Sequence, residues 1–75
     1  MIRYKIDVLK ELQARGFTTT KILREKLLPG QTLFNMKQGK SITMESLNKL
    51  CLLLRMQPGA IIEEVPTDEE KIKYF

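Results

Sequence analysis

Two short helical patterns separated by a tight break constrain the fold of this chain more than any other feature of its sequence. They cover about residues 19–26 and 30–38, and the break between them is Leu27-Leu28-Pro29-Gly30. Pro29 cannot continue a helix, because it lacks an amide hydrogen and its ring clashes with the preceding turn, but it can begin one. The sequence therefore predicts two helices joined by a turn of a few residues.

Particular residues mark the limits of this helix pair. Thr18 is the best N-cap for the first helix, because Phe17 then occupies the apolar staple position before the cap. Ile22 and Leu23 are predicted to face inward. Gly39 is placed to stop the second helix.

Three further helices are predicted outside this segment, over about residues 4–15, 44–54 and 58–63. Gly16 is placed to end the first with a left-handed cap, Thr43 to cap the second, and Pro58 to occupy the first position of the third. Apolar residues alternate over residues 2–6, which leaves a short extended start as the alternative. We therefore expect an all-α domain of five helices over residues 1–65.

Residues 66–75 follow this domain as an acidic tail. Ile72, Tyr74 and Phe75 alternate with lysines in the manner of a strand edge. Two such segments can pair across a dimer as an arm, or one can pair with residues 1–5. A frayed terminus is the remaining alternative.

Charge is distributed unevenly along the chain. Residues 1–62 hold eleven Lys or Arg against four Asp or Glu, a net of +7, whereas residues 63–75 hold two against five, a net of −3. A basic body suits a polyanionic partner such as a nucleic acid, and the acidic tail does not. An ordinary solvated basic surface is the alternative.

Composition argues against an enzyme and against a metal or cofactor site. The chain has no histidine, and its single cysteine, Cys51, lies on the inward face of the helix predicted at 44–54. We therefore expect no catalytic residue, no metal and no cofactor. No apolar run approaches the roughly 18 residues that span a membrane, and the N-terminus lacks the apolar core of a signal peptide. We expect a cytoplasmic protein with no membrane partner.

The helix predicted at 30–38 carries a row of amide side chains. At about 100° per residue, Gln31, Asn35 and Gln38 fall within roughly 60° of one another, and Leu33 and Met36 fall on the opposite side. Amide side chains can pair bidentately with adenine in the DNA major groove. The pattern therefore indicates a short helix that reads base edges, with a solvated polar face as the alternative.

Four other residues of this segment are candidates for contacts with a duplex. Phe34 lies at the edge of the amide face, where it can touch a thymine methyl group or fold back into the core. Thr32 is at the helix start, where free amides help to bind a phosphate. Lys37 and Lys40 lie near the expected groove edge and are predicted to contact phosphates.

The segments that carry a wider resemblance run from residue 16 to residue 62. They are Phe17-Thr18, Ile22-Leu23, Thr32-Leu33, Met36, Gly39-Lys40, Thr43-Met44-Glu45-Ser46-Leu47, Cys51-Leu52-Leu53-Leu54 and Pro58-Gly59-Ala60-Ile61-Ile62. Their order and spacing resemble the Cro/C1-type (Xre family) helix-turn-helix domain of phage and bacterial repressors. MIRYKIDVL, KLLPGQTLFNMKQGKS, ESLNKLC and MQPG look like a compact branch of small Cro-like regulators from Gram-positive bacteria and their mobile elements.

The resemblance implies a lambda-repressor-like domain that binds operator DNA, usually as a two-fold pair. The positions that meet base edges in that family are here Gly30, Gln31 and Asn35. The position that touches phosphate or a flanking base at the start of the preceding helix is Thr19. Lys37 and Lys40 stand where the family contacts the DNA backbone.

The chain also departs from the family's pattern at three positions. Leu27 replaces the glycine of the turn, and Leu23 replaces a small alanine, so both add bulk where the two helices cross. Lys37 replaces an acid that often pairs with a buried arginine of the first helix. We therefore expect a wider crossing or a longer turn, and no buried pair of this kind.

We interpret the chain as a sequence-specific, double-stranded DNA-binding transcriptional regulator, a repressor that acts as a homodimer at least on DNA. The alternative is a protein-interaction module of the antitoxin or anti-repressor type that uses the same fold. Such a module would bind a protein partner tightly and show little salt-sensitive affinity for DNA.

Overall fold

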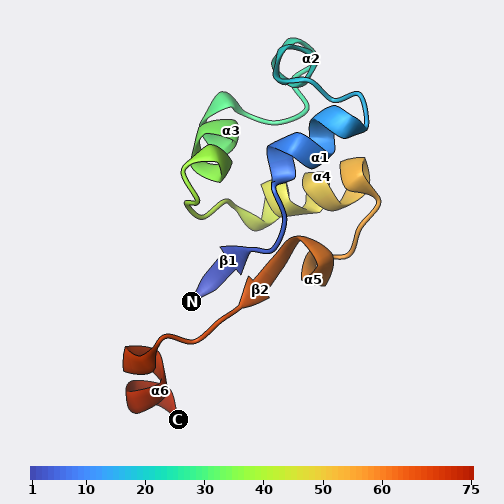
Figure 1. The fold of residues 1–75 in the computed structure, drawn as a ribbon. Coiled ribbons are helices and arrows are strands. Elements are labelled where there is room, and N and C mark those ends of the chain that lie inside the picture. Colours follow the sequence, from blue (N-terminus) through green and yellow to red (C-terminus); the bar gives the residue numbers. More distant parts are fainter.

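Six helices and one two-stranded sheet make up the fold in the computed structural model, which describes residues 1–75 (Figure 1). In chain order the elements are β1 (Ile2–Tyr4), α1 (Val8–Ala14), α2 (Thr19–Arg24), α3 (Gly30–Lys37), α4 (Met44–Leu54), α5 (Pro58–Ile61), β2 (Ile62–Glu64) and α6 (Asp68–Tyr74). The predicted helical domain is confirmed, with α1–α5 as its five helices. None of the helices is long and apolar enough to cross a membrane.

The core is built from one face of each of α1–α5 and from the turn between α2 and α3. Its buried apolar side chains are Val8, Leu12, Ile22, Leu28, Leu33, Met36, Leu47, Leu50, Leu54 and Ile61. Helix α1 packs against both α3 and α4, so it lies at the centre of the domain (Figure 1). Because Leu33 and Met36 are held in this core, the opposite face of α3 is left towards solvent.

The first helix begins at Val8 and not at Tyr4, so its predicted start was wrong and the alternative of an extended start is correct. The carboxylate of Asp7 accepts a hydrogen bond from the first turn and caps α1. Upstream of it, β1 pairs antiparallel with β2, with Tyr4 opposite Ile62. The same pairing ends α5 at Ile61, two residues before its predicted end, because the following backbone groups bond to β1.

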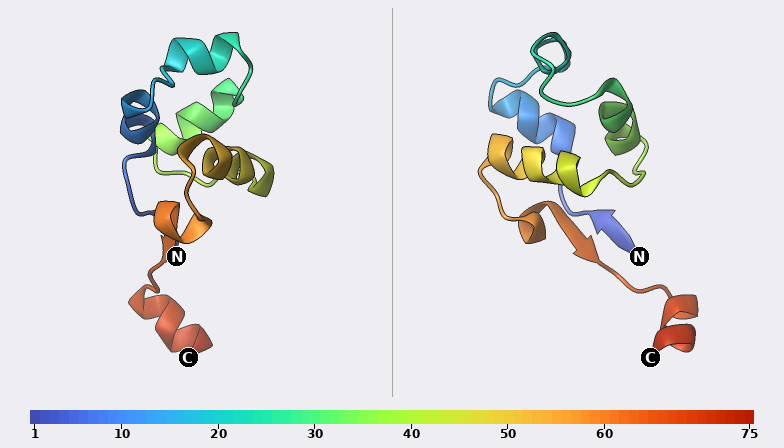
Figure 2. Two further views of the ribbon diagram at one scale, coloured as in Figure 1. Left: turned by 90° about the vertical axis from the view of Figure 1, so that its right-hand side faces the viewer. Right: turned by 180° about the vertical axis from the view of Figure 1, so that it is seen from behind.

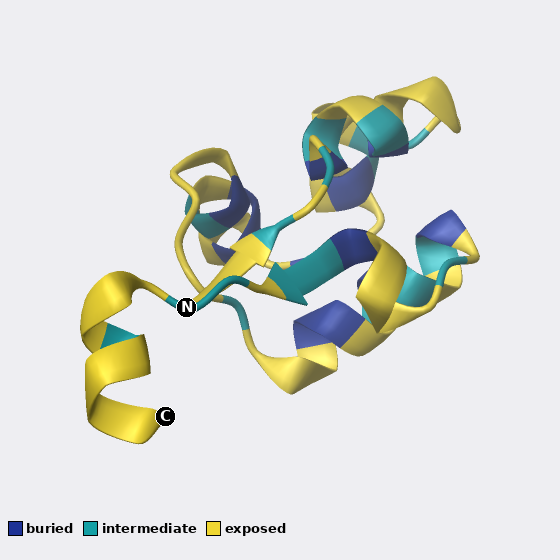
Figure 3. Cartoon of the chain, turned by 60° about the horizontal axis from the view of Figure 1, so that its bottom comes forward, coloured by how far each residue is buried: buried dark blue, intermediate teal, exposed yellow.

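The tail is helical, which overturns both strand-like readings of residues 72–75. Thr67 and Glu70 form a capping box at the start of α6, and acids in its first turn suit the positive end of the helix dipole. The amino group of Met1 bonds to Glu70 at 2.6 Å, and this bond lowers the pKa of the Glu70 carboxyl. Otherwise α6 stands apart from the body (Figure 2), and nearly all of it is exposed (Figure 3).

Four helices end on a left-handed residue that folds the chain back over the last turn. These residues are Gly16 (φ 86°), Lys26 (φ 54°), Gly39 (φ 72°) and Arg55 (φ 55°). At the end of α3 the amide of Gly39 donates to Met36 and that of Lys40 donates to Asn35, so two terminal carbonyls are satisfied. Glycine adopts this conformation without the steric cost that a side chain brings.

Gly39→Ala is therefore expected to destabilise the domain by about 1 kcal/mol, a fall in Tm of roughly 4–8 °C. A Cβ added at Gly39 meets no atom within 4 Å, so the loss of stability comes from backbone strain and not from a steric clash. Thermal unfolding followed by circular dichroism measures it. Gly59→Ala is the matched control, since Gly59 also faces open space but lies in a helix without a positive φ. It should be neutral or slightly stabilising. Equal losses at both positions would contradict the backbone explanation.

Candidate nucleic-acid interface

The turn between α2 and α3 fixes the orientation of α3 on the core. Ile22 in α2 and Leu28 in the turn are both buried and hold the two helices to the core. The left-handed residue of the turn is Lys26, while Leu27 is half-buried against the core. The bulky side chain of Leu27 is thus accommodated by packing against the core. The amide of Leu27 donates a hydrogen bond to the carbonyl of Ile22, and this bond closes the turn.

Leu23 does not face inward as predicted, since 47% of its side chain is exposed. It lies beside the start of α3, where a Cβ placed on Gly30 would come within 3.7 Å of its Cδ2 atom. Helix α2 has only six residues, and its contact with the core is made by Ile22 one position earlier. A Cβ at Gly30 would therefore make an ordinary van der Waals contact with Leu23, without a clash.

The amide row of α3 lies on the surface, as the sequence predicted. Gln31 and Gln38 are exposed, and Asn35 is half-buried. The Nε2 atom of Gln31 donates to the Oδ1 atom of Asn35 at 2.9 Å, so these two amides are aligned one turn apart. Gln31 keeps its oxygen as an acceptor and Asn35 keeps its nitrogen as a donor. Adenine presents an acceptor at N7 and a donor at N6, which is the complementary set.

Thr32 is placed differently from its neighbours on α3. It is buried, with 6% of its surface exposed, and its hydroxyl bonds at 3.1 Å to the hydroxyl of Ser46 in α4. The structure therefore speaks against the predicted phosphate contact of Thr32. Its side chain instead joins α3 to α4 through a buried pair of hydroxyl groups.

Phe34 and Lys40 form a unit at the end of α3. Half of the Phe34 side chain is exposed, and the Nζ atom of Lys40 lies 5.7 Å from the centre of its ring. The backbone carbonyl of Lys40 accepts a hydrogen bond of 2.6 Å from the hydroxyl of Tyr4 in β1. Burial raises the pKa of the Tyr4 phenol above its ordinary value. The exposed reading of Phe34 thus fits the structure better than a core position.

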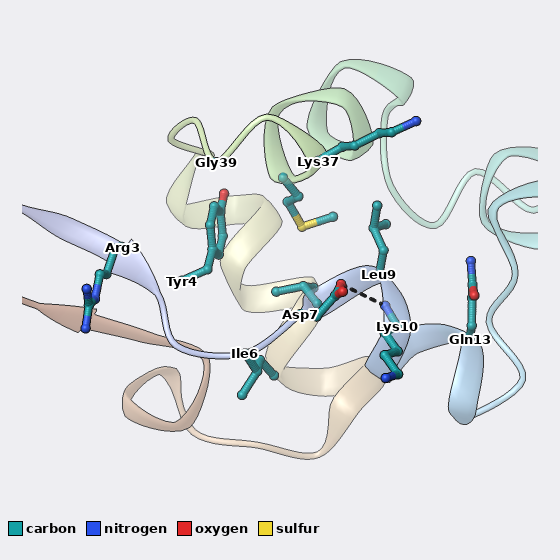
Figure 4. Close-up of a pocket in the computed structure, with 11 residues that line it drawn as sticks. Arg3, Tyr4, Ile6, Asp7, Leu9, Lys10, Gln13, Lys37 and Gly39 are labelled. Carbon is teal, nitrogen blue, oxygen red and sulfur yellow. Dashed lines mark hydrogen bonds between the residues drawn. The ribbon is translucent and has the colours of Figure 1, made fainter.

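A hollow on one flank of α3 is lined by basic residues from three elements, whose side chains lie apart from one another (Figure 4). Lys37 comes from α3, Lys10 from α1 and Arg3 from β1, and Asp7 is the one acid on its wall. Asp7 is already engaged, since its carboxylate caps α1 through the amide of Lys10 (Figure 4). Lys10, which the sequence analysis did not single out, therefore lines the same hollow as the predicted phosphate contact Lys37.

A second hollow lies on the opposite flank, between α3 and the start of α4. Gln31 and Asn35 line it together with the hydroxyl residues Ser41 and Thr43 and the partly buried Lys49. Sequence reasoning missed Lys49. Its spacing of three from the buried Ser46 places both on one side of α4, and that signal could have found it. Glu45 also lines this hollow, so an acid stands among the candidate contacts.

Thr19 and Gly30 hold the first positions of α2 and α3, and both are exposed. The hydroxyl of Thr18 is occupied in capping α2, through the amide of Lys21, whereas Thr19 has no such task. All the predicted contact residues other than Thr32 are exposed or half-buried: Thr19, Gly30, Gln31, Phe34, Asn35, Lys37, Gln38 and Lys40. No group of three or more His, Cys, Asp or Glu side chains is arranged to hold a metal ion.

A comparison of the sequence with models of known protein families identifies this domain. The family model for the Cro/C1-type helix-turn-helix DNA-binding domain matches residues 7–67, well over half of the chain. The match covers α1–α5, β2 and all the predicted contact residues from Thr19 to Lys40. No curated protein and no solved structure matches the chain.

Proposed function

The chain belongs to the Cro/C1-type helix-turn-helix DNA-binding family, and we propose that it is a sequence-specific transcriptional regulator, acting as a repressor in the cytoplasm. In this proposal α3 enters the major groove of an operator and α2 braces it against the DNA backbone. Bound protein then denies polymerase its access to the promoter. No chemical step is needed.

The aligned amide pair of α3 carries this proposal. Gln31 and Asn35 are bonded to each other and still offer one acceptor and one donor outward. A pair that is already ordered loses less side-chain entropy when it meets a base edge than two free amides would. Gln38 and Phe34 extend the same surface and read the neighbouring base pairs in our proposal.

The basic residues on both flanks of α3 support the same orientation. Lys37 with Lys10 lies on the side of α1, and Lys49 lies on the side of α4. A helix in the major groove has a phosphate strand on each side, so cations on both flanks suit it. Thr19 and Lys40 complete the set of contacts that we propose with the DNA phosphates.

Two copies of the chain would address one operator. Half-sites read by a two-fold pair of such domains lie about 34 Å apart, one turn of DNA. Selection of bound sites from random duplex DNA tests the proposal. A recovered palindrome with this spacing is expected. A protein that selects no sequence and binds DNA with no dependence on salt would contradict it, and would favour the alternative of a protein-interaction module.

Loss of one contact with the DNA phosphates should change how strongly the binding affinity depends on salt concentration. Lys37→Ala and Lys40→Ala are each expected to weaken binding to every duplex and to flatten the slope of log K against log salt by about one unit. Titrations at several salt concentrations, on operator and on random DNA, measure both effects. Lys5→Ala is the control, because Lys5 is exposed, its Nζ atom bonds to the carbonyl of Gly59, and it lines neither hollow beside α3. An unchanged slope would exclude the residue tested from phosphate contact.

A further inference from the structure

An apolar groove lies between the sheet and the segment that follows α3. Tyr4 and Ile62 are paired across the sheet and point to the same face as Ile2, because side chains alternate along a strand. These three residues line the groove together with apolar side chains from the other wall, namely Ile42, Met44 and Leu47. Its volume is about 340 Å³, and Met44 and Ile2 are 80% and 60% exposed. The groove is therefore open and has no cover within its own chain.

Helix α6 carries apolar side chains that are equally uncovered. Ile72 and Phe75 are 84% and 86% exposed and lie three residues apart, on one side of the helix. Glu70, which holds α6 to the amino group of Met1, lies roughly 160° from Ile72 around the helix. The apolar side of α6 therefore faces away from the contact that ties it to its own body.

Charges around the two surfaces are opposite in sign. Asp68 and Glu69 flank Ile72 on α6, within a tail whose net charge is −3. Lys40 lines the groove, within a body whose net charge is +7, whereas the guanidinium of Arg3 is already paired with Glu63. Apolar centres with complementary charged rims are the arrangement found in specific protein interfaces.

We propose that α6 of one copy docks in the groove of a second copy, and that the second copy returns the same contact. This exchange deepens the proposed function, since it names the contact that joins the two DNA-binding domains. We call each contact of an α6 with the groove of the other copy a joint. A two-fold pair contains two identical joints, because each copy supplies one α6 and one groove. The groove is also lined by residues 39–41, directly after α3, so the joint would set the position of one α3 relative to the other.

Sedimentation of the full chain without DNA tests this proposal separately from operator binding. Wild-type protein is expected to dimerise, and Ile72→Glu and Met44→Glu are each expected to raise the dimer dissociation constant at least about tenfold. Both positions are exposed, and Met44 begins α4, where an acid is tolerated, so the fold should persist. Leu52→Glu is the matched control, because Leu52 is 69% exposed but lies outside the groove.

A mixture of the two variants gives the sharpest result. Met44→Glu protein keeps an intact α6 and Ile72→Glu protein keeps an intact groove, so a mixed pair has one complete joint and either variant alone has none. The mixture should therefore associate more tightly than either variant. Monomeric wild-type protein at about 1 mM, a mixture no tighter than its components, or an equal loss with Leu52→Glu would each overturn the exchange.

Discussion

Leu50→Ala is expected to remove about 3 kcal/mol from the free energy of unfolding, a loss typical of a fully buried leucine. Leu50 has no exposed surface and lies in α4, at the centre of the core. Truncation removes the transfer free energy of the deleted carbons and leaves a cavity that the neighbouring helices close only in part. A domain of this size has roughly 4–11 kcal/mol in total, so the variant would lose a large share of its stability.

Urea unfolding and thermal unfolding, both followed by circular dichroism, measure this loss. The expected fall in Tm is roughly 12–24 °C. Leu52→Ala is the matched control, because it makes the same change two residues along the same helix, where 69% of the side chain is exposed. It should change stability by less than about 0.5 kcal/mol. Similar losses in the two variants would contradict the assignment of Leu50 to the core.

The features that the sequence predicts well are those whose causes are local. The predicted bounds of α4 agree with the structure, because Thr43 caps its start and the apolar repeat through Leu54 keeps one face inward. The amide row of α3 is local too, since Gln31 and Asn35 are one turn apart on a helix that breakers delimit on both sides. Spacing along one short segment suffices for such predictions.

The features that the sequence did not predict depend on residues far apart in the chain. The pairing of Tyr4 with Ile62 joins segments almost sixty residues apart, and no pattern within either segment reveals the other. The sequence predicts a phosphate contact for Thr32, but the hydroxyl of this residue is buried against that of Ser46 in another helix. Tertiary contacts decide such cases, and local propensity yields to them.

The helical tail is a different kind of error. The alternation of Ile72 and Tyr74 with lysines is typical of a strand, but Thr67 followed by Glu70 is equally typical of a helix start. The capping box supplies hydrogen bonds within the segment itself, whereas a strand needs a partner edge. Both patterns are present in this tail, and the helix forms because its backbone hydrogen bonds are made within the segment.

Asn35→Ala is expected to weaken binding to the selected operator by roughly 10–100-fold and to leave binding to random DNA nearly unchanged. The amide of Asn35 is the donor in the pair that we propose reads adenine, and its oxygen already holds Gln31 in position. The truncation therefore removes one base contact and releases the other. Competition titrations with operator and random duplexes at one salt concentration measure the two affinities.

Gln31→Ala and the double variant complete a thermodynamic cycle for this pair. Because the two amides are bonded to each other, the double variant should lose less operator affinity than the sum of the single losses. Asn48→Ala serves as the control, since Asn48 is an exposed asparagine of α4 that lines neither flank of α3. Equal losses on operator and random DNA would remove Asn35 from base reading. Strictly additive losses would instead show that the two amides meet the DNA independently, because an ordered pair cannot lose one member without disturbing the other.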